Sequence, residues 1–210
     1  MPLYKTIQVN PTTQILLWKI TESYGQLISE VELKEKTALR LVRMKSEQHR
    51  RGFLSVRKLL QEVGYTDFDL HYDEFGKPYF DDGKHISISH SHEFAAIIIS
   101  DKITGIDLEM CREKIINIAD KFLHETEYPF MDKNDPDYIP KLTVLWGIKE
   151  VVFKIRNEIG ISFKDHVRAE AFEMRENTTA AHLEMNDTNL AFPIYFEKIE
   201  SFILVYAFGE

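Results

Sequence analysis

Two short acidic motifs, about forty residues apart, constrain the fold of this chain more than any other feature. Residues 105–109 read GIDLE and residues 146–154 read WGIKEVVFK. The first motif alternates polar and apolar residues like a β-strand. Side chains alternate between the two faces of a strand, so Asp107 and Glu109 point the same way while the apolar residues between them face the core. The fold must therefore contain a strand that carries two carboxylates on one face.

The second motif has the spacing of a helix, in which residues four apart share a face, here Trp146, Glu150 and Lys154. Three converging carboxylates suit a hard divalent cation such as Mg²⁺, and a lysine suits a phosphate group that the cation also contacts. Each motif alone is weak evidence, because acidic strand residues usually face solvent and Glu150–Lys154 is an ordinary helical pair. Together they predict a magnesium-dependent enzyme that acts on a phosphate ester.

Composition limits the other classes of protein. The 210 residues, 44% of them hydrophobic, allow one domain or two small ones. No apolar run approaches the length of a membrane span, and residues 1–6 lack the features of a signal peptide, so we expect a cytoplasmic protein without membrane contact. Cys111 is the only cysteine, which excludes a disulfide framework and a cysteine metal site. We interpret it as structural, because no partner base identifies it as a nucleophile.

The net charge of −8 hides a local excess of positive charge. Between residues 34 and 58 there are nine basic and two acidic residues, a local charge of +7 (nine minus two). A basic patch on an acidic protein favours a local anionic ligand over general affinity for nucleic acid. The alternative interpretation is an ordinary solvated helix surface.

The periodicity of the chain predicts an α+β fold. Strands are expected at 14–20, 68–72, 85–89, 94–100, 103–109, 163–174, 181–185, 192–198 and 201–208, with helical segments at 30–62 (broken near Ser46), 116–131 and 142–159. Each half then contains a long helix followed by strands and a closing hairpin. We expect two pseudo-symmetric subdomains, 1–102 and 103–210, each a small, mainly antiparallel sheet packed against a long helix, with the site at their interface.

Two further motifs can bind an anion. Residues 85–91 read HISISHS, and Ser89 and His90 stand where this strand leaves its sheet, so N–H groups, a hydroxyl and an imidazole can face one anion. Residues 75–78 read FGKP, which is typical of a turn. Its Lys77 either binds phosphate or is simply exposed.

The order and spacing of these motifs resembles the 4′-phosphopantetheinyl transferases, in the monomeric, two-subdomain branch that includes the surfactin-synthetase activator. The two acidic motifs in combination are the specific part of the resemblance. Glu127-Tyr128 adds support, because the family often has these residues between the acidic motifs. Residues 46–54, SEQHRRGFL, look like the family's arginine-bearing helix. One departure is His92, which stands where the family often has a small residue.

The resemblance implies transfer of phosphopantetheine from coenzyme A to a serine of an apo-carrier protein, with release of 3′,5′-ADP. It implies that residues 1–102 bind the nucleotide and its phosphates and that residues 103–210 bind metal and catalyse. The implied roles are Mg²⁺ binding by Asp107, Glu109 and Glu150, a phosphate contact by Lys154, binding of nucleotide phosphates by Ser89, His90 and Arg51, and contact with adenine and ribose by Lys77 and Pro78. The remaining basic residues would steer an acidic carrier, and the internal repeat implies a monomer.

Two points stay open at this stage. The base that deprotonates the carrier serine is Glu150, a water on the metal, or Glu127. A carboxylate coupled to a dication is a weaker base, which argues against giving both tasks to Glu150. The competing functions are a catalytically silent module that binds coenzyme A or a carrier, and a magnesium-dependent pyrophosphohydrolase.

Overall fold

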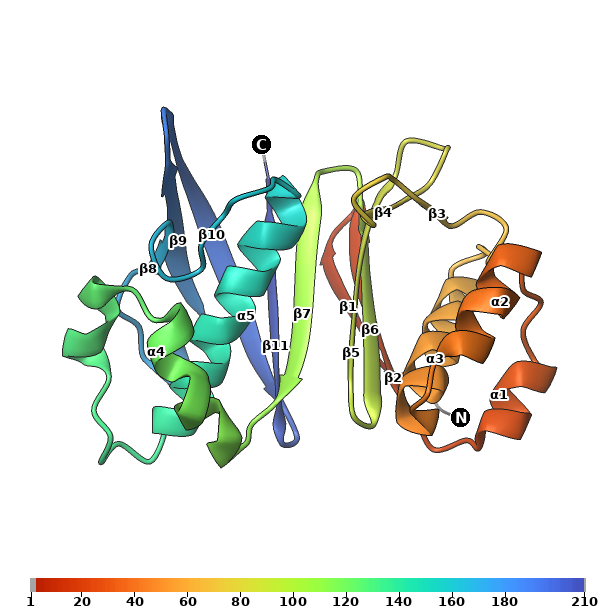
Figure 1. Cartoon of the computed structure of the whole chain (residues 1–210), viewed down its shortest axis with the longest axis horizontal. Coiled ribbons are helices and arrows are strands. Elements are labelled where there is room, and N and C mark those ends of the chain that lie inside the picture. Colours follow the sequence, from red (N-terminus) through yellow and green to blue (C-terminus); the bar gives the residue numbers. More distant parts are fainter. Residues whose placement is uncertain (1–2, 210) are drawn as a thin grey trace. The chain divides into compact units, whose positions relative to one another are not determined.

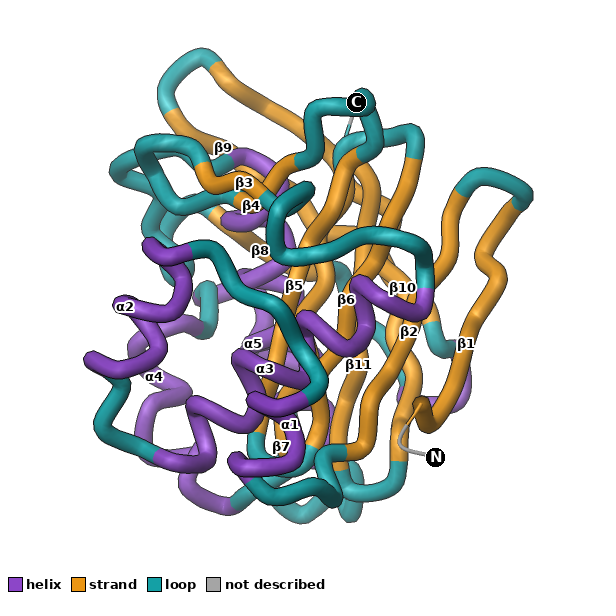
Figure 2. Tube along the Cα trace, turned by 90° about the vertical axis from the view of Figure 1, so that its right-hand side faces the viewer, coloured by secondary structure: helices purple, strands orange, loops and turns teal. Residues whose placement is uncertain are grey.

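The structure, a computed structural model, describes residues 3–209. The chain forms two compact units that divide between Ile103 and Thr104, one residue beyond the predicted boundary (Figure 1). Each unit combines helices with antiparallel strands, drawn in purple and orange in Figure 2. The fold therefore has the predicted α+β class, with mainly antiparallel sheets packed against long helices. Among the described helices, none is long and apolar enough to cross a membrane.

The first unit is a four-stranded sheet covered by helices. Its elements are β1 (Leu3–Asn10), β2 (Thr13–Lys19), α1 (Tyr24–Ser29), α2 (Glu35–Arg43), α3 (Glu47–Glu62), β3 (His71–Tyr72), β4 (Pro78–Tyr79), β5 (His85–Ser91) and β6 (Phe94–Ser100). The sheet has the order β1-β2-β6-β5, and β3 and β4 form a separate pair. Leu54 and Leu60 of α3 pack with Leu16 of β2 and Ile97 of β6 in the core. The break predicted near Ser46 is confirmed, because its side chain caps α3 by accepting a hydrogen bond from the His49 amide.

The second unit is a five-stranded sheet against which one long helix packs. Its elements are β7 (Thr104–Met110), the 3₁₀ helix η1 (Glu113–Ile118), α4 (Ala119–Phe122), the 3₁₀ helix η2 (Glu125–Phe130), α5 (Tyr138–Arg156), β8 (Val167–Ala169), the 3₁₀ helix η3 (Met174–Glu176), β9 (Thr178–Met185), β10 (Thr188–Ile199) and β11 (Phe202–Phe208). The order is β7-β11-β10-β9-β8, so the acidic strand pairs with the last strand. Buried residues occur on every side of α5, and it lies along β7 and β11 (Figure 1).

Three predicted elements were wrong in extent. The helix expected at 116–131 is three short pieces, because Leu123 is extended, the His124 side chain caps a new 3₁₀ turn, and Pro129 lies within that turn. The strand expected at 163–174 shrinks to β8, and the strand expected at 68–72 shrinks to β3. Short irregular segments such as these carry little periodic signal, since a few residues cannot distinguish one period from another.

The two closing hairpins share one backbone feature. β5 joins β6 and β10 joins β11 through two-residue turns. The first residue of each turn, His92 or Glu200, has a positive φ of 51°. Residues that carry a Cβ, apart from Asn and Asp, rarely adopt this conformation, because the Cβ approaches the following carbonyl. Among the described residues, five other than glycine have a positive φ, and three of these are asparagines, which tolerate it. The other two are His92 and Glu200, so these two turns are the strained positions.

Replacing Glu200 with asparagine is expected to raise the free energy of unfolding by about 0.5–1 kcal/mol, because asparagine tolerates positive φ better than glutamate. Urea unfolding followed by circular dichroism measures the change. Glu200→Ala is the control, since it removes the same side chain without relieving the backbone. Equal stabilities of the Asn and Ala variants would contradict the explanation by strain.

Candidate functional site

The acidic strand and the acidic helix come together because two glycines allow a close approach. A Cβ built on Gly105 of β7 would lie 2.7 Å from the carbonyl oxygen of Val151 in α5. A Cβ built on Gly147 of α5 would lie 2.6 Å from Cγ2 of Val205 in β11, and 3.7 Å from Oδ2 of Asp107. Positions 105, 107 and 109 share one face of β7, so the carboxylates face α5. Both faces of β7 are buried from Thr104 to Leu108, so the face that carries Asp107 is covered as well as the face of Ile106 and Leu108.

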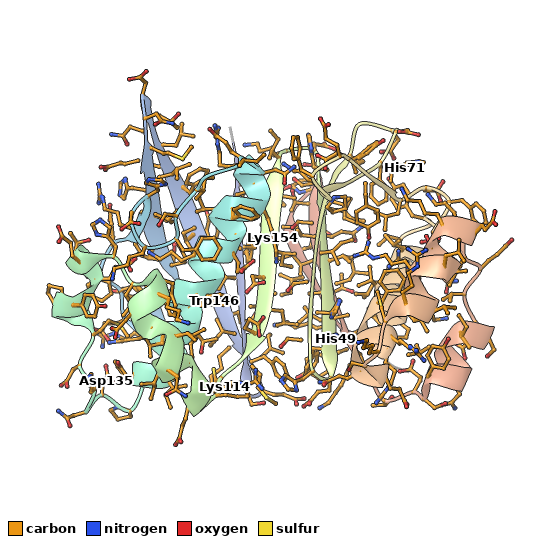
Figure 3. The ribbon with its side chains drawn as sticks, in the orientation of Figure 1. His49, His71, Lys114, Asp135, Trp146 and Lys154 are labelled. Carbon is orange, nitrogen blue, oxygen red and sulfur yellow. The ribbon has the colours of Figure 1, made fainter. Side chains whose placement is uncertain are left out.

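Lys154 joins the end of the helix to the strand. Its Nζ donates hydrogen bonds to the backbone oxygen of Ile106 and to Oδ1 of Asp107, each at 2.8 Å. Asp107 is only 3% exposed, so this charged contact is screened weakly by water. Figure 3 shows Lys154 on the side of α5 that faces β7, with Trp146 further toward the start of the same helix. The structure thus adds a direct contact between Lys154 and the acidic strand, while the phosphate contact implied for this lysine stays a prediction.

Glu150 lies on α5 between Gly147 and Lys154. Burial raises the pKa of its carboxyl, and the negative charge of Asp107 raises it further, while Lys154 acts in the opposite direction. The two carboxylates therefore repel each other across the gap between helix and strand. A cation between them would remove that repulsion, so the chemistry of the donor groups fits a divalent metal.

Glu109, the third predicted metal ligand, lies two residues beyond Asp107 on the same face of β7. It lines a pocket of about 220 Å³ together with Trp146, Arg112 and Lys114. Within residues 3–209, no three His, Cys, Asp or Glu side chains are arranged as a metal-binding cluster. The metal assignment of the three carboxylates stays a prediction.

Glu127 occupies a different environment from the one expected of a base. It is 0% exposed, and its Oε1 accepts hydrogen bonds from Lys149 Nζ at 2.6 Å and from the Ala169 amide at 2.7 Å. Its Oε2 accepts one from the His124 amide at 2.8 Å. Burial lowers the pKa of Lys149, and the Glu127 carboxylate acts in the opposite direction. This position favours a structural role for Glu127 over the predicted role as a base.

In the first unit, the arginine-bearing helix and the His-Ser strand also meet. A Cβ built on Gly52 of α3 would lie 2.8 Å from Nδ1 of His90 on β5. The imidazoles of His49 and His90 have centroids 6.4 Å apart. Ser89 is buried while His90 is exposed, so the imidazole is the accessible group of this pair. The two predicted phosphate-binding motifs are thus neighbours in space.

Arg51 lines a second pocket, of about 260 Å³, with Gln48, His92 and Glu93. Its Nη2 donates to the backbone oxygen of Ile20 at 3.0 Å. Its Nε is buried, and within residues 3–209 it has no hydrogen-bond partner. A buried N–H without an acceptor is costly, which fits a site that receives an anionic ligand.

Pro78 begins strand β4 of the small β3–β4 sheet, and Lys77 lies in the turn just before it. Asp73 closes this turn by accepting hydrogen bonds from the amides of Phe75 and Lys77. β4, which begins at Pro78, contacts β5, the strand of His90. The roles of Lys77 and Pro78 along adenine and ribose stay predictions.

Burial raises the pKa of the Cys111 thiol, which is half-buried at the end of β7. A higher pKa leaves less thiolate at neutral pH, so this cysteine has the properties of a structural residue.

The sequence reasoning missed two residues that matter here, Lys149 and Gly52. Lys149 was missed because helical spacing places it off the face that carries Trp146, Glu150 and Lys154. Gly52 was missed although it lies between two residues already singled out, Arg51 and Phe53.

The sequence resemblance implies that this site binds coenzyme A, and we expect Gly52→Ala to weaken that binding about ten-fold, because the new methyl group would displace the His90 imidazole. The KM for coenzyme A in a carrier-modification assay measures the effect. The double variant Gly52→Ala/His90→Ala should be no worse than His90→Ala alone, since both changes act on one group. Additive effects of the two substitutions would contradict this coupling.

Comparisons with known proteins agree with the geometry. A family model described as the 4′-phosphopantetheinyl transferase superfamily matches residues 103–207, half of the chain. The 4′-phosphopantetheinyl transferase gsp of Aneurinibacillus migulanus is 36% identical over 107 residues, which cover 49% of this chain and 45% of the relative. The transferases ffp of Bacillus subtilis and Sfp of Bacillus subtilis strain 168 are 29% and 26% identical over 142 and 141 residues, 63% of each chain. The chain covers less than two thirds of the length of each of these relatives.

Proposed function

The chain belongs to the 4′-phosphopantetheinyl transferase superfamily, and we propose on this basis that it transfers phosphopantetheine from coenzyme A to a serine of an apo-carrier protein. In this reaction the serine oxygen attacks the pantetheine-bearing phosphorus of the pyrophosphate. The bond from that phosphorus to the bridging oxygen breaks, 3′,5′-ADP leaves, and the serine proton passes to a base. The observation that carries the proposal is the contact of Lys154 with Asp107, beside Glu150, in the matched region.

We propose that Asp107, Glu109 and Glu150 hold Mg²⁺. The bound ion would supply neutralising charge at the pyrophosphate, the main requirement of phosphoryl chemistry. Lys154 uses two of its three N–H groups on Ile106 and Asp107, which leaves one to donate to a phosphate oxygen. That donor would be fixed in place before the substrate arrives, and fixed donors stabilise charge that develops on the leaving group.

For the serine proton, we propose an acceptor at the metal site, either Glu150 or a water on the metal, rather than Glu127. Burial and the charge of Asp107 raise the pKa of Glu150 in the metal-free protein, and a bound dication would act in the opposite direction. Glu127 has no exposed surface with which to reach a hydroxyl. We assign nucleotide phosphates to Arg51, Ser89 and His90, supported by the buried Nε of Arg51 and the exposed imidazole of His90.

The test is a mass measurement on a panel of apo-acyl, apo-peptidyl and apo-aryl carrier proteins. Each is incubated with the chain, coenzyme A and Mg²⁺, and the expected product is a carrier heavier by one phosphopantetheine. Omitting coenzyme A is the control. No mass gain on any carrier would refute the proposal, and release of phosphopantetheine without a carrier would identify a pyrophosphohydrolase instead. We also propose that the chain is a monomer, and light scattering on the purified protein tests this. The cytoplasmic location stays a prediction.

A further inference from the structure

The second unit contains a fully buried ion pair that the transfer reaction does not use directly. Glu127 and Lys149 are both 0% exposed, with 2.6 Å between Oε1 and Nζ. Lys149 also donates to the backbone oxygen of Val167. The carboxylate and the ammonium group are thus both enclosed in protein, and both make hydrogen bonds.

The pair ties three separate segments together. Glu127 belongs to η2, Lys149 to α5, and the backbone groups of Val167 and Ala169 to β8. Through its other oxygen, Glu127 also holds the amide of His124, which begins η2. A shift of α5 relative to either neighbour would break a hydrogen bond of a buried charge, which is strongly unfavourable.

Lys149 is placed to control the direction of Glu150. At 3.6 residues per turn, it lies about 200° around α5 from Gly147, the residue that packs on β11. The helix is therefore held at the sheet by Gly147 and on its other side by Lys149. Because side chains extend about 5 Å from a helix axis, a rotation of about 10° would move the adjacent Glu150 carboxylate by about 1 Å. Displacements of that size are enough to impair a reaction.

Stability alone does not require charges at this position. Burying two charges costs desolvation energy, and an apolar pair of similar volume is often as stable. Buried ion pairs are best understood where they fix one arrangement among several. Here the arrangement they would fix is the rotation of the helix that carries Glu150.

We propose that Glu127 and Lys149 are positioning residues whose buried ion pair fixes the rotation of α5 and so holds the Glu150 carboxylate toward Asp107. The kinetic part of this inference rests on the proposed transferase function and the metal-affinity part on the proposed metal site, while the position of α5 rests on neither.

The experiment compares Glu127→Leu/Lys149→Met, an apolar replacement of the whole pair, with Lys149→Met alone. Lys141→Met is the matched control: Lys141 is also buried on α5 and pairs with Asp135 at 2.8 Å and Glu173 at 3.0 Å, but lies about 13 Å along the helix from Glu150. Each variant is measured for Tm, for Mn²⁺ affinity by calorimetry, and for kcat and KM with a carrier. The double variant and the wild type are also crystallised without metal.

Lys149→Met should lower Tm by about 10 °C, and the double variant should recover most of that loss. The double variant should nevertheless show Mn²⁺ affinity and kcat reduced about ten-fold or more, with the contact between Lys154 Nζ and Asp107 Oδ1 lengthened in its crystal structure. Lys141→Met should lower Tm while metal affinity and kcat stay within two-fold of the wild type.

The proposal is overturned if the double variant keeps both the wild-type position of α5 and wild-type metal affinity, because the pair then serves stability alone. If the wild type modifies no carrier, the transferase function fails, while the crystal structures still decide the positioning role. Glu127→Asp, which keeps the charge and shortens the side chain by one methylene, replaces the double variant in the same comparison if the latter does not fold.

Discussion

Glu150→Gln is expected to lower phosphopantetheine transfer by a factor of about 10³ while it raises the Tm of the metal-free protein by a few degrees. The amide keeps the shape of the carboxylate but loses the charge that would bind a cation. It also removes the repulsion by Asp107 and the cost of burying a second negative charge. Loss of activity with gain of stability is typical of groups held in place for function.

The same substitution should change the pH dependence of stability. The raised pKa means that folded Glu150 keeps a proton at pH values where the unfolded carboxyl has released it. Unfolding in that window releases protons, so the metal-free wild type should lose stability as pH rises from the ordinary carboxyl pKa through the raised one. The Gln variant should lack this part of the decline. Urea unfolding in the presence of a chelator, at a series of pH values, measures both proteins.

Glu158→Gln is the matched control, because Glu158 lies just beyond α5 and pairs with Arg156 at the surface. It should change transfer by less than two-fold, since a surface ion pair contributes little. Activity retained in Glu150→Gln would remove Glu150 from both the metal site and proton transfer. A Tm below that of the wild type would show instead that the carboxylate stabilises the metal-free fold.

The second large effect is expected from Gly105→Ala, which should lower the free energy of unfolding by about 1–3 kcal/mol or more. The new methyl would lie 2.7 Å from the carbonyl oxygen of Val151, so the whole helix must retreat from β7. Because Lys154 and Glu150 move with the helix, transfer should fall as well. Chemical unfolding and the carrier assay measure the two effects on one preparation.

Two other glycines provide the controls. Gly147→Ala meets the side chain of Val205, not backbone, so Val205→Ala should restore part of its stability. No side-chain substitution should rescue Gly105→Ala in this way. Gly25→Ala, on α1, finds its nearest contact at 4.0 Å and should be neutral or stabilising by up to about 1 kcal/mol. A neutral Gly105→Ala would show that α5 tolerates a wider separation from β7.

Sequence reasoning predicted the long regular elements because their periodicity is strong. The helix containing Glu150 and the hairpin of β10 and β11 were found near their observed positions. It missed β1 and α1, and it joined η1, α4 and η2 into one helix. A 3₁₀ turn and a four-residue helix show too few repeats to be recognised, and their conformation is decided by caps such as His124 and by tertiary contacts.

The candidate site was predictable where spacing determines direction. Alternation along β7 placed Asp107 and Glu109 on one face, and the structure adds that α5 covers this same face. Spacing could not reveal that Glu127 would be enclosed by Lys149, because that contact joins segments 22 residues apart through a loop without periodicity. A buried partner of this kind is set by three-dimensional packing, which local pattern does not contain.

The pairing of β7 with β11 also bears on how the second unit is made. β7 is the first strand of that unit and β11 the last, so their register joins residues 104–110 to residues 202–208. Such a nonlocal contact forms slowly, and during synthesis it cannot form until β11 has left the ribosome. The strand that carries Asp107 therefore stays unpaired along its β11 edge until the rest of the unit has been translated. Assembly of the acidic site is expected to be among the last events of folding, and a nascent chain arrested before β11 should lack it.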